Sequence, residues 1–100
     1  MITLHYGSKI IELDIPEENL CFNLTRNKIQ ASTNEVEEIQ RAIQNPVGSK
    51  RLKDLVTKDA SVVIMVDDRT RMTPQKLILP VVLEELHSAG IKNDQIKLVI

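Results

Sequence analysis

The sequence predicts an α/β fold with an N-terminal β-hairpin, then helices, then a strand–helix–strand unit. Three observations support this prediction. Two alternating apolar segments flank a Gly-Ser pair, a continuous apolar run lies in the second half of the chain, and a helical pattern separates that run from another apolar strand. The chain has 100 residues, a formal net charge of −1 and 42% apolar residues. These values fit one small domain and disfavour intrinsic disorder.

Residues near the N-terminus are predicted to form the β-hairpin. Segments 2–6 and 11–15 alternate apolar and polar side chains. The Gly7-Ser8 pair between them indicates a two-residue turn, because glycine accepts a positive φ at the first turn position. Pro16 should end the second strand, since proline cannot donate to a ladder. Residues 17–33 are polar and irregular, so we expect mostly loop.

Two helices are expected after this loop. Ser32 and Glu35 fit a capping box at the start of the first helix, which Asn45-Pro46 should end. Its buried stripe is predicted to consist of Val36, Ile39 and Ile43. Ser49 is expected to cap a short second helix, whose inward-facing residues are Leu52, Leu55 and Val56.

Residues 61–66 form a continuous, β-branched apolar run. Such continuity predicts a strand that is buried on both faces, with Met65 in the core. Residues 96–100 are predicted to form a second strand, parallel to the first and joined to it by a right-handed crossover, as in a Rossmann-like βαβ unit. Two parallel strands need neighbours, so either the hairpin joins the sheet or the chain belongs to a larger protein. The stop at Ile100 favours the larger protein, and the exposed sheet edge then predicts self-association.

The crossover between these strands is predicted to be a helix from about Pro74 to Ala89. Thr73 and Pro74 fit its N-cap and first helical residue, and Gly90 fits its end. Pro80 lies inside this helix and is expected to kink it, because proline removes a backbone hydrogen bond.

The charged segment from Asp67 to Pro74 is the strongest candidate site. It joins the carboxyl end of a strand to the start of a helix, where open α/β sheets bind ligands and helix N–H groups favour anions. Arg69 and Arg71 can form bidentate bonds to a phosphate or carboxylate. Asp68 can orient an arginine or accept from a ribose, and Thr70 adds a hydroxyl. The alternative is a solvated turn with Asp–Arg pairs and no ligand.

Other residues give weaker signals. His5 and His87 share no spacing motif, so no metal site is predicted. Lys50, Arg51 and Lys53 form a basic cluster that is expected to be a solvated helix face, with a contribution to a phosphate site as the alternative.

Composition excludes further classes of partner. Thirteen basic residues against 14 acidic ones disfavour an electrostatic nucleic-acid binder. The single cysteine, Cys21, cannot form an internal disulfide, which fits a reducing, cytoplasmic compartment, and its apolar neighbours predict that it is buried. No apolar stretch approaches the roughly 18 residues that span a bilayer. We therefore expect neither a nucleic-acid nor a membrane partner.

The segment Asp68–Pro74 resembles the D-x-T-R-P-T-P motif of the nickel-dependent lactate racemase family, with Met72 where that family usually has proline. Three other stretches resemble the family in the same order: the hairpin from Tyr6 to Leu13, the segment Asn45–Ser49 followed by Leu52, and the helix Leu79–Leu86 followed by Ala89-Gly90. The likeness covers nearly the whole chain.

The resemblance implies that the chain is the N-terminal part of a larger two-domain enzyme. That enzyme would racemise or epimerise a small 2-hydroxy acid with a nickel pincer nucleotide, a pyridinium mononucleotide whose thiocarboxylate arms hold the metal. The family's D-x-T-R loop contacts cofactor and substrate, which carries over to Asp68, Arg69, Thr70 and Arg71. Of these, Arg71 would bind a carboxylate or phosphate and Asp68 would make a polar contact, so both are the catalytic candidates.

The family's catalytic histidines, its cofactor-tethering lysine and its metal-binding histidine all come after the point where this chain stops. No residue here is therefore assigned to the metal. The isolated chain is expected to be inactive and to hold no cofactor tightly. A non-catalytic α/β module that binds a nucleotide or another anion is the alternative.

Overall fold

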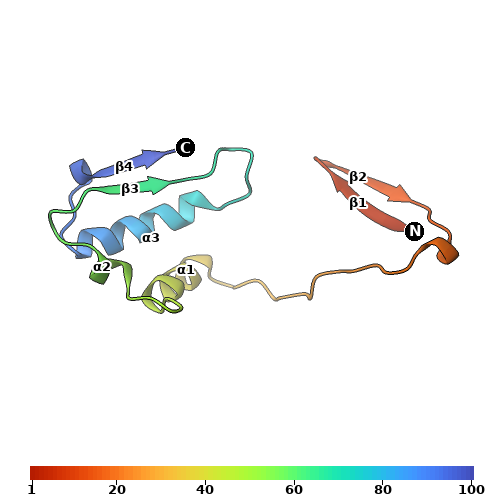
Figure 1. Cartoon of the computed structure of the whole chain (residues 1–100), viewed down its shortest axis with the longest axis horizontal. Helices are drawn as coiled ribbons and strands as arrows, with labels where there is room; N and C mark the ends of the chain where they lie inside the picture. Colours follow the sequence, from red (N-terminus) through yellow and green to blue (C-terminus); the bar gives the residue numbers. More distant parts are fainter. The chain divides into compact units, whose positions relative to one another are not determined.

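The computed structural model describes all 100 residues, which divide into two compact units, Met1–Gln30 and Ala31–Ile100. The first unit contains strands β1 (Ile2–Tyr6) and β2 (Lys9–Leu13) and a single 3₁₀ turn (Glu17–Asn19). The second contains, in chain order, α1 (Glu35–Gln44), α2 (Leu52–Leu55), β3 (Val62–Met65), α3 (Gln75–Ser88), a 3₁₀ turn (Asn93–Gln95) and β4 (Ile96–Val99) (Figure 1).

The first unit is the predicted antiparallel hairpin. Ile2 lies opposite Leu13 and Tyr6 opposite Lys9, so two residues make the turn. Gly7 takes φ +60°, as a two-residue turn of this kind requires, and the serine after it keeps a negative φ. The predicted second strand, 11–15, is two residues too late. A two-residue turn obliges pairing to begin at once, and the five residues of β1 run out of partners after Leu13.

The remainder of the first unit has no regular structure apart from its 3₁₀ turn, which confirms the predicted loop. Cys21 is exposed there, so its expected burial is wrong. The apolar neighbours Phe22 and Leu24 are themselves exposed and form no cluster that would cover the thiol.

The second unit contains the predicted βαβ arrangement. β3 and β4 are parallel, with Val62 opposite Ile96 and Met65 opposite Val99, and α3 is the crossover between them. They form a sheet of two strands, separate from the hairpin sheet. The larger two-domain enzyme expected from the resemblance stays a prediction.

Only one face of β3 is covered within this unit. Val62 and Ile64 are half-buried, whereas Val63 and Met65 are 57% and 84% exposed. The expected burial on both faces, with Met65 in the core, is therefore wrong for this chain. The reason is that α3 packs on one side of the two-stranded sheet, and no element of the unit packs on the other.

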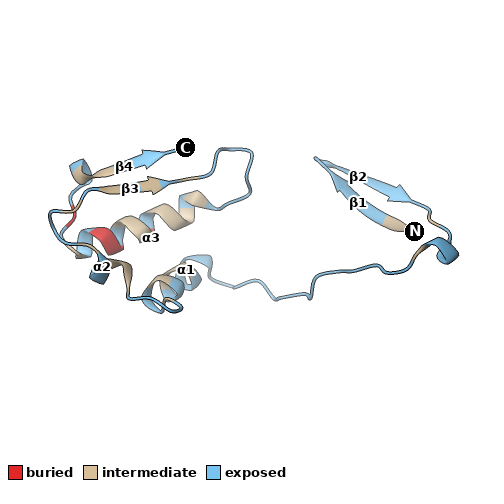
Figure 2. Ribbon diagram, viewed as in Figure 1, coloured by how far each residue is buried: buried red, intermediate tan, exposed pale blue.

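The C-terminal end of α3 forms the centre of the small core, shown in red in Figure 2. The Ile91 N–H donates to the Leu86 carbonyl at 3.2 Å and the Gly90 N–H to the His87 carbonyl at 2.9 Å, which is a Schellman motif. Gly90 takes φ +87°, a conformation that favours glycine, so the predicted helix end is confirmed. Leu86 and Ile91, which this motif brings together, are 1% and 2% exposed. Pro80 lies within α3, and the expected kink stays a prediction.

The other side of α3 contacts α1 and α2. Both of these helices begin later than predicted. Asn34 caps α1, because its side chain accepts from the Glu37 N–H at 3.2 Å, while the Ser32 hydroxyl donates to the Asn34 carbonyl. Arg51 is the N-cap of α2. The Ser49 hydroxyl donates to the carbonyl of the next residue and caps nothing.

Candidate functional site

The loop Asp67–Pro74 follows β3 and leads directly into α3, so all four predicted site residues lie together at the carboxyl ends of the strands (Figure 1). Every residue of the loop is exposed. The position is the one at which parallel α/β sheets bind ligands, because strand ends and a helix N-terminus meet there.

Asp68 is held by Thr70. One carboxylate oxygen, Oδ1, accepts from the Thr70 backbone N–H at 2.8 Å and from the Thr70 hydroxyl. The hydroxyl, and then the backbone N–H, hold the pKa of Asp68 below its ordinary value, so the side chain is charged at neutral pH. The pair forms an Asx turn, which fixes the direction of the chain immediately before Arg71.

Asp67 closes the base of the loop. Its carboxylate oxygen Oδ2 accepts from the Thr73 hydroxyl, and its backbone carbonyl accepts from the Gln75 side-chain amide. The Thr73 hydroxyl therefore faces Asp67 and does not cap α3. This explains why the helix starts at Gln75, with Pro74 as N-cap, one residue after the predicted start.

Arg69 and Arg71 carry guanidinium groups that pair with no carboxylate. The two ion pairs of the chain lie within α1 and between the start of α2 and α3. The Arg71 backbone N–H donates to the Asp68 carbonyl at 3.2 Å, which anchors this arginine in the turn. Both arginines border a shallow recess of about 310 Å³, together with Asp68, Thr73, Pro74, Gln75, Lys76 and Leu77. The loop thus presents cationic donors, and the alternative of a turn made of Asp–Arg pairs is not what the structure has.

A second recess, of about 170 Å³, is bordered by Asp67, Thr73 and Gln75. Its remaining lining is apolar and comes from β3 and α3: Ile64, Met65, Val66, Ile78, Leu79 and Val82. Thr73 and Gln75, at the base of the loop, therefore border both a cationic recess and an apolar one.

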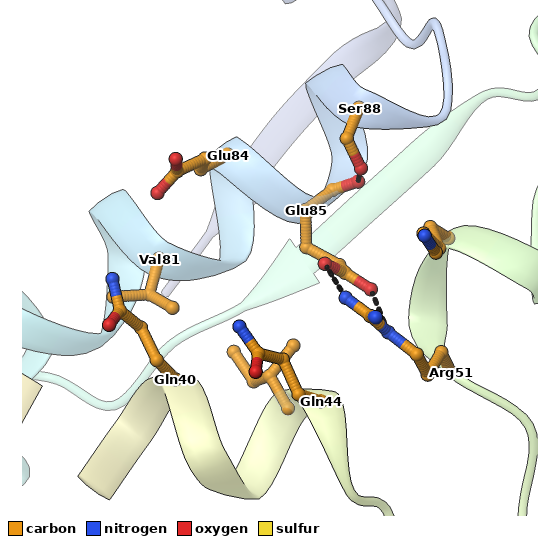
Figure 3. A pocket seen from close by; sticks show the side chains of 9 residues that line it. Gln40, Gln44, Arg51, Val81, Glu84, Glu85 and Ser88 are labelled. Atoms are coloured by element: carbon orange, nitrogen blue, oxygen red, sulfur yellow. Dashed lines mark hydrogen bonds and ion pairs between the residues drawn. The ribbon is translucent and has the colours of Figure 1, made fainter. Parts of the chain in front are cut away.

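The sequence analysis missed the pairing of Arg51 with Glu85. Figure 3 shows the bidentate contact, in which Arg51 Nε lies 3.1 Å from Glu85 Oε1 and Arg51 Nη2 lies 2.9 Å from Glu85 Oε2. Glu85 is 8% exposed, and the Arg51 hydrogen bonds hold its pKa below the ordinary value although burial acts in the opposite direction. The basic cluster is thus not a wholly solvated face. Because 34 residues separate the partners, no local sequence pattern predicts the pair.

The two histidines lie in different units. His87 Nε2 lies 2.8 Å from Asn93 Oδ1, after the end of α3. His5 lies in the other unit, on β1. No three His, Cys, Asp or Glu side chains gather closely enough to hold a metal ion. No helix has the length and apolarity that spanning a membrane would require.

Comparison with known protein families identifies the chain. Residues 6–100 match the lactate racemase N-terminal domain, which covers all of the structure except the first five residues. This chain belongs to the lactate racemase family. The predicted family is thereby confirmed, and the loop Asp67–Pro74 lies within the matched region.

Two curated lactate racemases are similar over most of this chain. The lactate racemase of Thermoanaerobacterium thermosaccharolyticum is 31% identical over 102 residues, which cover 99% of this chain and 24% of that relative. The lactate racemase of Lactiplantibacillus plantarum is 33% identical over 94 residues, covering 89% of this chain and 22% of that relative. The chain spans about a quarter of the length of the lactate racemases it matches.

Proposed function

We propose that this chain is part of a racemase or epimerase of small 2-hydroxy acids, in which the loop Asp67–Pro74 forms one wall of the active site. One observation carries the proposal. In this member of the lactate racemase family, the guanidinium groups of Arg69 and Arg71 lie at a strand–helix junction and have no carboxylate partner. Guanidinium groups beside the N-terminus of a helix suit an anion such as a carboxylate or phosphate.

The donor chemistry of the loop fits the family's cofactor, the nickel pincer nucleotide. That cofactor carries a phosphate and thiocarboxylate arms, which are anionic, and Arg69 and Arg71 offer N–H donors, whereas the N–H and hydroxyl of Thr70 donate to Asp68. When bound, the group would supply the site that takes a hydride from the substrate and returns it. The loop residues bind and orient anionic groups, and the proposal assigns none of them to the metal.

Arg71 is the principal ligand in this proposal. Its backbone is anchored to Asp68, whereas Arg69 makes no hydrogen bond that would fix its direction. A guanidinium that starts from a fixed backbone loses less conformational freedom when it forms a bidentate contact. Asp68, charged and held by Thr70, makes the polar contact beside it.

The test is the racemisation rate of Arg71→Lys and Arg69→Lys in the full-length, cofactor-loaded protein. Lysine keeps the charge and loses the planar fork. A lost charge-assisted contact of about 1.5–3 kcal/mol corresponds to a ten- to hundredfold fall in kcat/KM for Arg71→Lys. Arg69→Lys should change the rate less. Wild-type behaviour of Arg71→Lys together with an inactive Arg69→Lys would overturn the assignment.

The isolated 100-residue chain should show no racemase activity and should not retain nickel. Moving a proton at carbon requires positioned acid and base groups, and both carboxylates of the loop are engaged by threonine hydroxyls. The measurements are racemisation of D- and L-lactate and the nickel content after dialysis. Stoichiometric nickel or measurable turnover would contradict this expectation.

A non-catalytic anion-binding module is the second candidate function. The same engagement of both carboxylates favours it, because the loop then offers donors and no free base. The encoding reading frame separates the two candidates. A downstream segment with further His and Lys residues supports the enzyme, and a stop codon directly after Ile100 supports the module.

A further inference from the structure

Opposite charges lie unusually close together along the loop and yet do not pair. Asp67, Asp68, Arg69 and Arg71 fall within five consecutive residues. Each carboxylate accepts instead from a threonine hydroxyl, Asp67 from Thr73 and Asp68 from Thr70. All the acidic groups within the loop are thus engaged by neutral donors, and both guanidinium groups stay without an anionic partner.

We propose that Thr73 and Thr70 are positioning residues that keep the charges of the loop apart. By occupying Asp67 and Asp68, the two hydroxyls leave Arg69 and Arg71 available to an external anion. This inference rests on the proposed function for the identity of that anion, a carboxylate or phosphate group. The threonines are not required to touch the ligand.

The geometry of the base of the loop supports this role. Thr73 bonds to the Asp67 side chain while Gln75 bonds to the Asp67 backbone carbonyl, so two contacts hold this aspartate to the start of α3. The carboxylate of Asp67 is therefore directed across the base of the loop. Asp68, Arg69 and Arg71 border one recess, Asp67 borders a second one, and Thr73 borders both. Asp67 and Asp68 precede Arg69 by two residues and by one residue in an exposed loop, so a released carboxylate lies within reach of a guanidinium.

The expected effect follows from competition. A carboxylate freed by loss of its threonine partner can pair with an arginine and remove part of the binding-competent population. An exposed ion pair has a small favourable free energy, which reduces the apparent anion affinity by about two- to sixfold. No formal charge changes in such a variant, so bulk electrostatics cannot account for the loss.

The experiment compares Thr73→Val, Thr73→Ser and the double variant Thr73→Val/Asp67→Asn in the 100-residue chain. Inorganic phosphate is the probe, and NMR follows the side-chain Nε–H signals of Arg69 and Arg71. Thr73→Val should weaken phosphate binding two- to sixfold, and Thr73→Ser should keep wild-type affinity. Asp67→Asn in the valine background should restore binding, because no released carboxylate then competes. A purely structural role for the hydroxyl would not be rescued by that second change.

Two further outcomes separate this inference from the proposed function. If phosphate moves neither arginine signal in the unsubstituted chain, the anion site of the proposed function fails. The inference that the threonines keep the charges apart is then tested by the Nε–H signals of Arg69 and Arg71 alone, without phosphate. They should shift and exchange more slowly with solvent in Thr73→Val and return in the double variant. Unchanged signals in Thr73→Val, or binding that is lost and not rescued, would overturn the inference.

Discussion

At the scale of single residues, the bidentate contact between Arg51 and Glu85 is the one ion pair that links two helices of the second unit. It joins the start of α2 to the last turn of α3, and Glu85 is nearly buried while Arg51 is about one-third exposed. Ion pairs at an exposed surface contribute little, because water screens them. A pair with one buried member is different, since removing its partner leaves a desolvated charge.

Glu85→Gln should lower the free energy of unfolding by about 1–2 kcal/mol at pH 7, because an amide replaces a charge-assisted acceptor. Urea denaturation followed by circular dichroism measures the change. Glu84→Gln is the matched control, since this neighbouring glutamate is exposed and forms no ion pair. Equal stability of the two variants would show that the contact contributes nothing.

The same pair predicts a pH dependence. The folded pKa of Glu85 lies below the ordinary value of about 4.3, so the unfolded chain binds the proton more readily. The stabilisation is therefore complete above the ordinary pKa and is lost as the pH falls through the lower folded pKa. The stability difference between wild type and Glu85→Gln should shrink below about pH 4.3. A difference that grows on acidification would contradict the sign.

Sequence could predict the loop at this scale but not the ion pair. Asp68, Arg69 and Arg71 predict a candidate site because they are charged residues within a span of four, 68–71, at a strand–helix junction. The pairing of Arg51 with Glu85 depends on how α3 packs against the segment before α2, which is tertiary information. The same holds for Thr73, whose hydroxyl bonds to a residue six positions earlier and so leaves α3 without a side-chain cap.

At the scale of elements, local chemistry determined what could be predicted. The hairpin turn and the end of α3 were correct because each depends on a glycine with positive φ, at Gly7 and Gly90. Helices α1, α2 and α3 each begin one or two residues later than predicted. Several Ser, Thr and Asn side chains compete for capping there, and sequence alone does not rank them. The predicted bounds of strand β2 were wrong, because the alternation of apolar and polar residues continues past the last residue that pairs with β1.

Gly7→Ala should weaken the hairpin by more than about 1 kcal/mol, because alanine is strained at φ +60°. Cross-strand contacts between Tyr6 and Lys9 in NMR spectra are the direct measurement, since those residues flank the turn. Ser8→Ala is the control at a position with negative φ and should leave the contacts unchanged. Equal contact intensities in both variants would show that the turn tolerates a Cβ at Gly7.

At the scale of the whole molecule, the order of elements determined the topology, and the order is readable from sequence. A helix that runs back along the sheet brings the next strand in parallel to the first, as with β3 and β4. The burial of β3 was not predictable in the same way. Its continuous apolar run indicates cover on both faces, whereas in this chain only α3 is present to provide it. Val63, Met65 and Val99 therefore lie exposed on one face of the sheet.

This exposed face, with the open edges of the two-stranded sheet, leads us to expect that the 100-residue chain associates with itself. Unpaired backbone groups at a sheet edge recruit further strands, and contiguous exposed apolar side chains add a driving force. Met65→Lys places a charge on this face, where Met65 is 84% exposed, and should shift the chain towards monomer. Gln44→Lys adds the same charge at an exposed position on α1 and should leave association unchanged. Sedimentation velocity over a concentration series makes the comparison. A wild-type chain that stays monomeric at the highest concentration, or an equal response of both variants, would show that the sheet does not drive assembly.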